Sequence, residues 1–175
     1  MNLMGIDVGT SSSKTAIFNE RLEMLKTSNI DYLIESAHKK GIKTILNPSP
    51  ITESLIKSKN LVLLDWVILN ELEAEAFTAD KSLKEVFPSA NIVKTLGKKG
   101  AICIIGNEEI FMTSSDFGAA VDTTGAGDTF TGFFFANILK GKSAQFAMKQ
   151  AADAAAISVT KNGAAESIPH RVKLY

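Results

Sequence analysis

The stretch Asp122-Thr-Thr-Gly-Ala-Gly-Asp-Thr-Phe-Thr-Gly132 (DTTGAGDTFTG) decides the fold. It follows the alternating segment 117–121, which predicts a strand or loop, and precedes the apolar periodic run 130–139, which predicts a helix. Its glycines permit backbone conformations and close approaches that a Cβ would prevent. The N–H groups of the first helical turn and the helix dipole favour an anion there. With the carboxylate of Asp128 beside it, such an anion cradle is what phosphoryl transfer to an alcohol needs.

The complete string resembles the C-terminal signature of the ribokinase (PfkB) family of sugar kinases. The resemblance implies that Asp128 is the base that takes the proton from the acceptor hydroxyl. It also implies that Gly125, Ala126 and Gly127 supply the anion hole for the transferred phosphate. The alternative is a tight strand-to-helix connection in which Asp128 only complements the helix dipole. Because the whole motif is present rather than a single glycine turn, we favour the functional interpretation.

Composition predicts one globular domain. The 175 residues can bury a real core, and 19 Lys plus Arg balance 19 Asp plus Glu, so no net field favours nucleic acid or an anionic membrane. The single cysteine, Cys103, lies in the apolar run 101–105 and is predicted to be a buried structural thiol. No apolar run approaches the length of a membrane span, and no basic N-terminal region leads to a cleavage site. The sequence therefore predicts a cytoplasmic protein.

Residues 1–20 differ in character from the rest of the chain. Apolar alternation on both sides of the polar segment 9–13 predicts a β-hairpin. The string Gly5 to Ser12 (GIDVGTSS) also resembles the first phosphate loop of the actin-like ATPase fold, in its xylulokinase and glycerol kinase branch. That resemblance implies that Asp7 lies near a metal; a plain hairpin turn explains the same residues equally well. We predict a hairpin of uncertain origin at 1–20 and a ribokinase-like nucleotide-binding domain at 21–175.

The chain from residue 21 onward alternates helices and strands, which predicts an α/β fold with a mainly parallel sheet. Helices are expected at 29–40, 52–58, 81–87, 130–140 and 143–160, and strands at 43–46, 66–69, 91–95, 101–105 and 109–112. The resemblance to ribokinases implies a three-layer, ribokinase-like Rossmannoid fold in truncated form. By the same resemblance, the sugar-binding half and the lid that precede these elements in the family are absent from this chain.

The tetrapeptide Asn70-Glu71-Leu72-Glu73 stands where a strand ends and a helix begins. It resembles the N-x-x-E motif of the family, whose Glu acts on the magnesium and phosphate environment through water. Asn at the N-cap with Glu three residues later is also a capping box. Both interpretations can hold at once, and the position after a parallel strand favours a site role for Asn70 and Glu73.

Two further segments resemble the nucleotide-binding parts of the family. In the turn 95–100 (TLGKKG), the resemblance places Thr95 and Gly97 beside the ATP phosphates. The alanine-rich helix 143–160 flanks the nucleotide base in the family. This chain has Ala152 where family members often carry Asn or His toward the base, so the adenine contact at that point is expected to differ.

The closing segment 161–169 resembles the last loop of ribokinases. By resemblance, its carbonyls join Asp122 and the carbonyl of Thr124 in a site for a monovalent cation such as K⁺. Glu23 matches a glutamate that contacts the sugar in the family.

The sequence thus predicts an ATP-dependent, Mg²⁺-requiring sugar kinase, with ribose as the preferred acceptor from the Asn47-Pro48-Ser49-Pro50 loop and the closing loop. One alternative is an inactive nucleotide-binding remnant, or a half-protein that needs a partner chain. A weaker alternative is a kinase of the xylulokinase type. The expected partners are ATP and a small sugar, without nucleic acid or membrane, and with a homo-oligomer or a complementary chain as an option.

Overall fold

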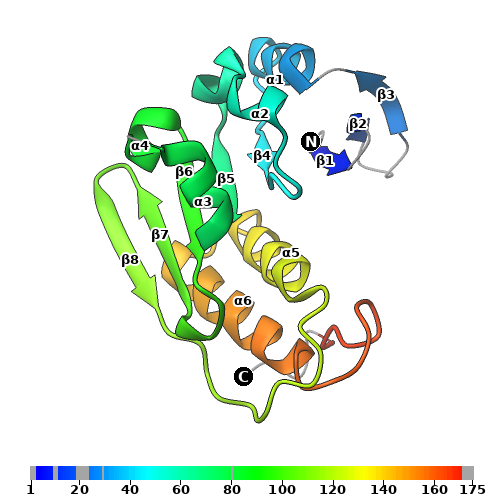
Figure 1. Ribbon diagram of the computed structural model, residues 1–175, viewed down its shortest axis with the longest axis vertical. Helices are drawn as coiled ribbons and strands as arrows, with labels where there is room; N and C mark the ends of the chain where they lie inside the picture. The colour runs from blue at the N-terminus through cyan, green and yellow to red at the C-terminus, as the bar shows by residue number, and fades with distance from the viewer. Residues whose placement is uncertain (1–2, 10–11, 19–23, 29, 80, 171–175) are drawn as a thin grey trace. The chain divides into compact units, whose positions relative to one another are not determined.

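The computed structural model describes the backbone of residues 3–9, 12–18 and 24–28, and both backbone and side chains of residues 30–79 and 81–170. The chain divides into two compact units. The first unit comprises Met1–Lys94 with Ile104–Asn107, and the second comprises Thr95–Cys103 with Glu108–Tyr175. Figure 1 shows the helices and strands of each. Glu23 lies outside the described residues, so its predicted sugar contact stays a prediction.

The first unit begins with a three-stranded sheet in the order β1-β2-β3. Strands β1 (Leu3–Gly9) and β2 (Ser12–Phe18) are antiparallel, with Leu3 opposite Phe18 and Gly9 opposite Ser12. Strand β3 (Met24–Ser28) pairs with β2, also antiparallel. The pairing of β1 with β2 matches the hairpin pattern of residues 1–20. The separate origin of that segment stays a prediction.

The first unit continues with alternating helices and strands. In chain order these are α1 (Ile30–Lys39), β4 (Ile45–Leu46), α2 (Glu53–Ile56), the 3-10 helix η1 (Lys59–Leu63), β5 (Trp66–Asn70), α3 (Glu71–Thr78), α4 (Leu83–Val86) and β6 (Asn91–Thr95). Helix α1 buries Leu33, Ile34 and Ala37, the face that the sequence predicts. These side chains join Val67, Phe87 and others in one hydrophobic core. The apolar periodicity of this region is therefore explained by packing alone.

The segment 43–46 was expected to be a strand along its whole length, but β4 contains only Ile45 and Leu46. The reason lies in Asp65. Its Oδ2 accepts a hydrogen bond from the backbone N–H of Thr44 at 2.9 Å and another from the Thr44 hydroxyl at 3.1 Å. The Thr44 amide is thereby bonded to a side chain, and Thr44 forms only a single bridge. Its carbonyl still accepts from the Trp66 N–H at 3.0 Å, and the ladder with β5 pairs Ile45 with Trp66 and Leu46 with Val67.

The second unit contains the turn η2 (Gly97–Lys99), most of β7 (Ala101–Ile105), β8 (Glu108–Met112) and two long helices, α5 (Ala126–Ile138) and α6 (Ala144–Ser158). The two helices pack on each other, and α6 also contacts β8. Helix α6 begins at Ser143, whose hydroxyl accepts a hydrogen bond from the Phe146 N–H at 3.2 Å. Segment 117–121, expected to be a strand or loop, is a loop.

Strands β4 to β8 form a five-stranded sheet in the order β4-β5-β6-β7-β8. Strands β4 and β5 are parallel, whereas β7 and β8 run in opposite directions (Figure 1), so the sheet is mixed. Helices accompany this sheet along the chain, and the predicted α/β class is confirmed. Cys103 is fully buried, as expected, and burial raises the pKa of its thiol to about 11.

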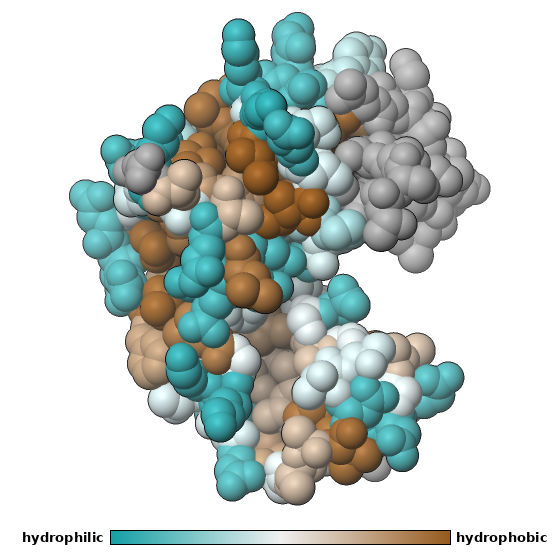
Figure 2. Space-filling view, in the orientation of Figure 1, coloured by the Kyte–Doolittle hydropathy of each residue, from teal (hydrophilic) through white to brown (hydrophobic). Residues whose placement is uncertain are grey.

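Figure 2 shows one face, on which hydrophilic and hydrophobic residues are interspersed. Among the described residues, no helix combines the length and the apolar character that a membrane crossing requires.

Candidate functional site

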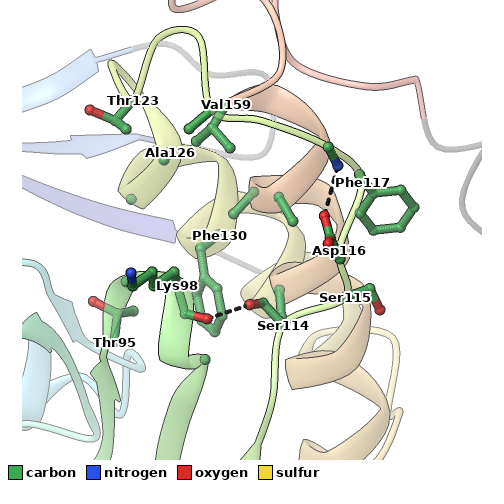
Figure 3. A pocket seen from close by; sticks show the side chains of 18 residues that line it. Thr95, Lys98, Ser114, Ser115, Asp116, Phe117, Thr123, Ala126, Phe130 and Val159 are labelled. Carbon is green, nitrogen blue, oxygen red and sulfur yellow. Dashed lines mark hydrogen bonds between the residues drawn. The ribbon is translucent and has the colours of Figure 1, made fainter.

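A pocket of about 600 Å³ lies within the second unit, and all of its lining residues belong to that unit. Four segments form its walls: the turn 95–100, the loop 114–120, the start of α5, and the C-terminal half of α6. Figure 3 shows Thr95 and Lys98 on one side of this pocket and Ser115, Asp116 and Phe117 on another. The volume suits a ligand the size of a nucleotide.

The start of α5 offers unpaired backbone donors. Gly125 precedes the helix in the left-handed conformation, with φ of 75°, and no side chain caps the helix there. The Ala126 N–H donates to the Thr123 carbonyl at 3.3 Å, whereas no protein acceptor is found for the N–H groups of Gly127 and Asp128 among the described residues. Gly127 lines the pocket. The helix start is thus open to an anion, and the dipole favours one.

Glycine is required at two places around this pocket. A Cβ on Gly125 would approach the Cβ of Ala164 at 3.3 Å, and the positive φ would strain any other residue. A Cβ on Gly100, whose φ is 110°, would lie 1.9 Å from the Met112 carbonyl oxygen. The turn 95–100 can therefore lie against the end of β8, and it closes with a hydrogen bond from the Leu96 N–H to the Gly100 carbonyl at 2.8 Å.

Helix α6 supplies a smooth apolar wall. Ala152, Ala155, Ala156 and Val159 line the pocket, and Phe130 of α5 completes this surface. Ala152 is buried, whereas Ala155 and Ala156 are half-buried and open to the pocket. Small side chains allow a planar ring to approach the helix closely, as expected for the base of a nucleotide.

The loop 114–120 is the part of the site that sequence reasoning missed. The Ser114 hydroxyl donates to the Lys98 carbonyl at 2.9 Å, and the Asp116 carboxylate accepts from the Gly118 N–H at 2.9 Å. The Ser115 hydroxyl bonds to Lys149 of α6. The only signal in the sequence was the turn-forming composition of Ser114 to Gly118 directly before the glycine signature.

Asp122 connects the glycine signature with the closing segment. Its Oδ1 accepts from the Thr124 N–H at 2.9 Å and its Oδ2 from the Gly163 N–H at 3.0 Å. Hydrogen bonds from the side chain and backbone of Thr124, with that from Gly163, hold the pKa of the Asp122 carboxyl below its usual value. The structure therefore connects Asp122 to Thr124 and to the closing segment through N–H groups. The cation site, which would use the carbonyls of Thr124 and of that segment, stays a prediction.

Asn70 and Glu73 belong to the first unit and form the capping box at the start of α3. The Glu73 N–H donates to Asn70 Oδ1 at 2.9 Å, and the Asn70 N–H donates to Glu73 Oε2 at 2.8 Å. The capping interpretation is confirmed, and the magnesium role stays a prediction. In the described part of the chain, no cluster of three or more His, Cys, Asp or Glu side chains suits a metal ion by itself.

The sequence-predicted residues in and around this pocket fall into two groups. Thr95, Gly97, Ala126, Gly127 and Ala152 line one pocket, although they come from three separate segments. Asp128 and Gly125 flank it at the start of α5, with the Asp128 side chain exposed.

Comparison with known proteins identifies the fold and the family. Residues 22–171 match the pfkB family carbohydrate kinases. The chain is 34% identical over 154 residues to the ribokinase of Haemophilus influenzae, a match that covers 82% of this chain and 50% of that protein. The chain therefore spans about half the length of the curated relatives it matches.

Solved structures of ribokinases share this fold. The ribokinase of Cryptococcus neoformans var. grubii serotype A in complex with ADP is 27% identical, with a TM-score of 0.70 over 79% of this chain and 54% of that one. The Arabidopsis thaliana ribokinase complexed with ribose and ATP is 28% identical, with a TM-score of 0.65 over 82% of this chain and 50% of that one. The ribokinase-like fold predicted from the sequence is confirmed, and the chain belongs to the pfkB family of carbohydrate kinases.

Proposed function

We propose that this chain forms the nucleotide side of an ATP-dependent sugar kinase, which transfers the γ-phosphoryl group to a hydroxyl of a pentose such as ribose. The observation that carries the proposal is the pocket of the second unit, which leads from an apolar wall on α6 to the open amides of α5. The ADP and the ribose with ATP in the two related structures support the choice of donor and acceptor.

Each wall of the pocket has a role in this reaction. The base lies against Ala152 and Ala156, and the turn with Thr95 and Gly97 borders the phosphates. The N–H groups of Gly127 and Asp128 hold the transferred phosphoryl group, whose negative charge the helix dipole stabilises. As the acceptor oxygen bonds to the γ-phosphorus, the bond from that phosphorus to the bridging oxygen breaks. ADP leaves with that oxygen, and the hydroxyl proton passes to the carboxylate of Asp128.

The proposal includes Mg²⁺ and a monovalent cation. Mg²⁺ would neutralise charge on the phosphate oxygens. Asn70 and Glu73 would hold it through water. The capping hydrogen bond uses one oxygen of the Glu73 carboxylate, so the other oxygen can accept a hydrogen bond from such a water. K⁺ fits the environment of Asp122, because the carboxylate is kept ionised between two loops. A cytoplasmic location is part of the proposal, since the enzyme would draw on cellular ATP.

A second candidate function is nucleotide binding without turnover unless another chain or segment supplies the acceptor site. The exposure of Asp128 favours it, because the proposed base does not line the pocket. Proton transfer requires the acceptor hydroxyl to be held against this carboxylate and water to be excluded. A second copy of the chain or a complementary chain would be the partner in that case. We expect weak turnover or none from this chain alone.

Calorimetric titration with MgATP, followed by a pentose and hexose panel with coupled ADP detection, tests both candidates. Binding with sugar-dependent ADP release supports the kinase. Binding without ADP release supports the nucleotide-binding candidate. If calorimetry detects no binding of MgATP at millimolar concentration, both candidates are wrong.

A further inference from the structure

The pocket wall formed by the loop 114–120 depends on side chains for its position. In the described part of the chain, no backbone-to-backbone hydrogen bond connects residues 113–120 to another segment. Strand β8 ends at Met112, and the next such bond is from the Val121 N–H to the Val159 carbonyl at 2.7 Å. A surface segment of this length without backbone bonds samples many conformations unless other contacts fix it.

Two consecutive serines provide these contacts. The Ser114 hydroxyl donates to the carbonyl of Lys98, which attaches the loop to the turn 95–100 (Figure 3). The Ser115 hydroxyl accepts from Lys149, which attaches the loop to α6. The loop is thereby held between the turn that borders the proposed phosphate site and the helix that forms the apolar wall.

Lys149 is itself held by a buried carboxylate. Its Nζ donates to Asp153 Oδ1 at 2.6 Å and to Oδ2 at 2.8 Å, and Asp153 is only 5% exposed. The three contacts of Lys149 match the three donors of its ammonium group. A buried carboxylate needs a paired cation, so Asp153 fixes Lys149 in place, and Lys149 then fixes Ser115.

Asp153 of the Lys149–Asp153 pair is adjacent to Ala152, the position at which this sequence differs from the family pattern. Ala152 removes a polar side chain from the pocket wall, and the adjacent Asp153 carries a charge that points to Lys149 instead of into the pocket. Because the helix contributes only alanines and Val159 to the wall, polar contacts to the ligand other than those of the α5 amides must come from the loop and the turn.

We propose that Lys149, held by Asp153, is a positioning residue that sets nucleotide affinity by fixing the loop 114–120 through Ser115. The inference rests on the proposed function for its choice of ligand, but the anchoring of the loop can be tested without a ligand. Without this anchor, binding of MgATP must also order the loop 114–120, so the affinity is expected to fall roughly tenfold.

Three variants separate positioning from general stability. Ser115→Ala removes the anchor and keeps the Lys149–Asp153 pair. Lys149→Met with Asp153→Ala removes the anchor together with the buried charge, so neither group is left unpaired. Lys149→Arg keeps a cation for Asp153 and a donor for Ser115. Lys39→Gln in α1 is the matched control, because Lys39 forms an exposed i,i+4 pair with Glu35 in the first unit.

The expected result is that Ser115→Ala and the double variant both raise the Kd for MgATP about tenfold by calorimetry, whereas their urea midpoints stay close to that of the unaltered chain. Lys149→Arg is expected to retain most of the affinity and Lys39→Gln all of it. Unchanged Kd values in both Ser115→Ala and the double variant would overturn the inference.

A ligand-free measurement keeps this test separate from that of the proposed function. Phe117 is exposed in the loop, and Phe146 is equally exposed in the first turn of α6. Chymotrypsin is expected to cleave after Phe117 several-fold faster in Ser115→Ala, with cleavage after Phe146 unchanged. If the unaltered chain binds no MgATP, the proposed function fails together with the effect on affinity, and the cleavage rate still decides the anchoring of the loop: equal rates after Phe117 in the two proteins overturn it.

Discussion

Asp128 lies in the first turn of α5 with its carboxylate exposed, next to amides that have no acceptor in the described residues. These two properties suit different parts of one reaction. In the proposed reaction, the amides stabilise the charge of the transferred phosphoryl group, and the carboxylate takes up the proton of the acceptor.

Asp128→Asn retains the size of the side chain and removes the proton acceptor. Where the chain, alone or with a partner that completes the acceptor site, shows sugar-dependent ADP formation, we expect this change to lower the rate roughly 10²–10⁴-fold and to alter the Kd for MgATP by less than about threefold. The coupled assay at high protein concentration and calorimetry measure the two quantities. Glu75→Gln, an exposed change in α3, is the control. Activity that survives Asp128→Asn would show that another group is the base.

Gly125 adopts a conformation that other residues reach only with strain. Gly125→Ala places a Cβ near Ala164 at a φ of 75°, and it is expected to lower the free energy of unfolding by about 1–2 kcal/mol. Gly132→Ala is the matched control within α5, since its Cβ would meet no atom within 4 Å. It is expected to raise stability by about 0.5–1 kcal/mol. Urea unfolding measures both, and equal effects would contradict the assigned backbone geometry.

Asp122 makes stability depend on pH in a defined direction. Its folded pKa lies below the ordinary value of about 4, so its ionised form stabilises the fold above that pH, and the contribution is lost as pH falls through the folded pKa. We expect Asp122→Asn to be less stable than the unaltered chain at pH 7. The difference is expected to shrink below about pH 4 in urea titrations across pH. A difference that grows on acidification would contradict this assignment.

At the scale of elements, helix α6 has two separate tasks. Its buried residues Ala147, Met148 and Ala151 pack in the interior, while Ala155 and Ala156 stay half-buried at the pocket. The same small side chain therefore serves close packing on one face and an open binding surface on another. Sequence periodicity alone does not distinguish these faces.

Ala156→Leu adds three carbon atoms to the pocket wall. Because the added atoms occupy the space proposed for the base, we expect MgATP binding to weaken about tenfold or more, in line with overpacking costs of about 1–3 kcal/mol. Ala136→Leu, at an exposed position of α5, is the matched control and is expected to leave the Kd unchanged. Calorimetry measures the Kd for MgATP of both variants, and equal affinities would show that the adenine base binds elsewhere.

At the scale of the whole molecule, the described pocket lies within the second unit, while the Asn70–Glu73 capping box lies in the first. The proposed nucleotide pocket thus does not require the first unit for its walls. A ligand that binds only the folded state stabilises it in proportion to the logarithm of its concentration.

MgATP at a concentration one hundred times its Kd is therefore expected to stabilise the fold by about 2.7 kcal/mol. Circular dichroism during thermal unfolding measures the gain as a rise in the midpoint. The same gain is expected for Asp128→Asn, since that change removes a base rather than a binding group. A midpoint that does not respond to MgATP would contradict nucleotide binding at any site.

Local patterns predicted much of the fold. Four of these patterns depend on residues a few positions apart: the period of α1, the strand β6, the capping box of Asn70 and Glu73, and the N-cap at Ser143. Such short-range interactions are encoded in neighbouring residues and can be read without knowledge of distant contacts. The predicted length of β4 was wrong, because the Thr44 amide is bonded to the side chain of Asp65, 21 residues away, and Thr44 forms a single bridge instead of continuing the strand.

The sequence by itself determined the family, the α/β class and the glycine signature at the start of α5, because these reside in contiguous motifs. Only the tertiary structure decided that Ser114 and Ser115 form a pocket wall, that Lys149 anchors it, and that Asp122 joins Gly163. Those contacts connect residues 16 to 41 positions apart. Nothing in the local sequence marks them, because their energy arises only when folding brings the segments together.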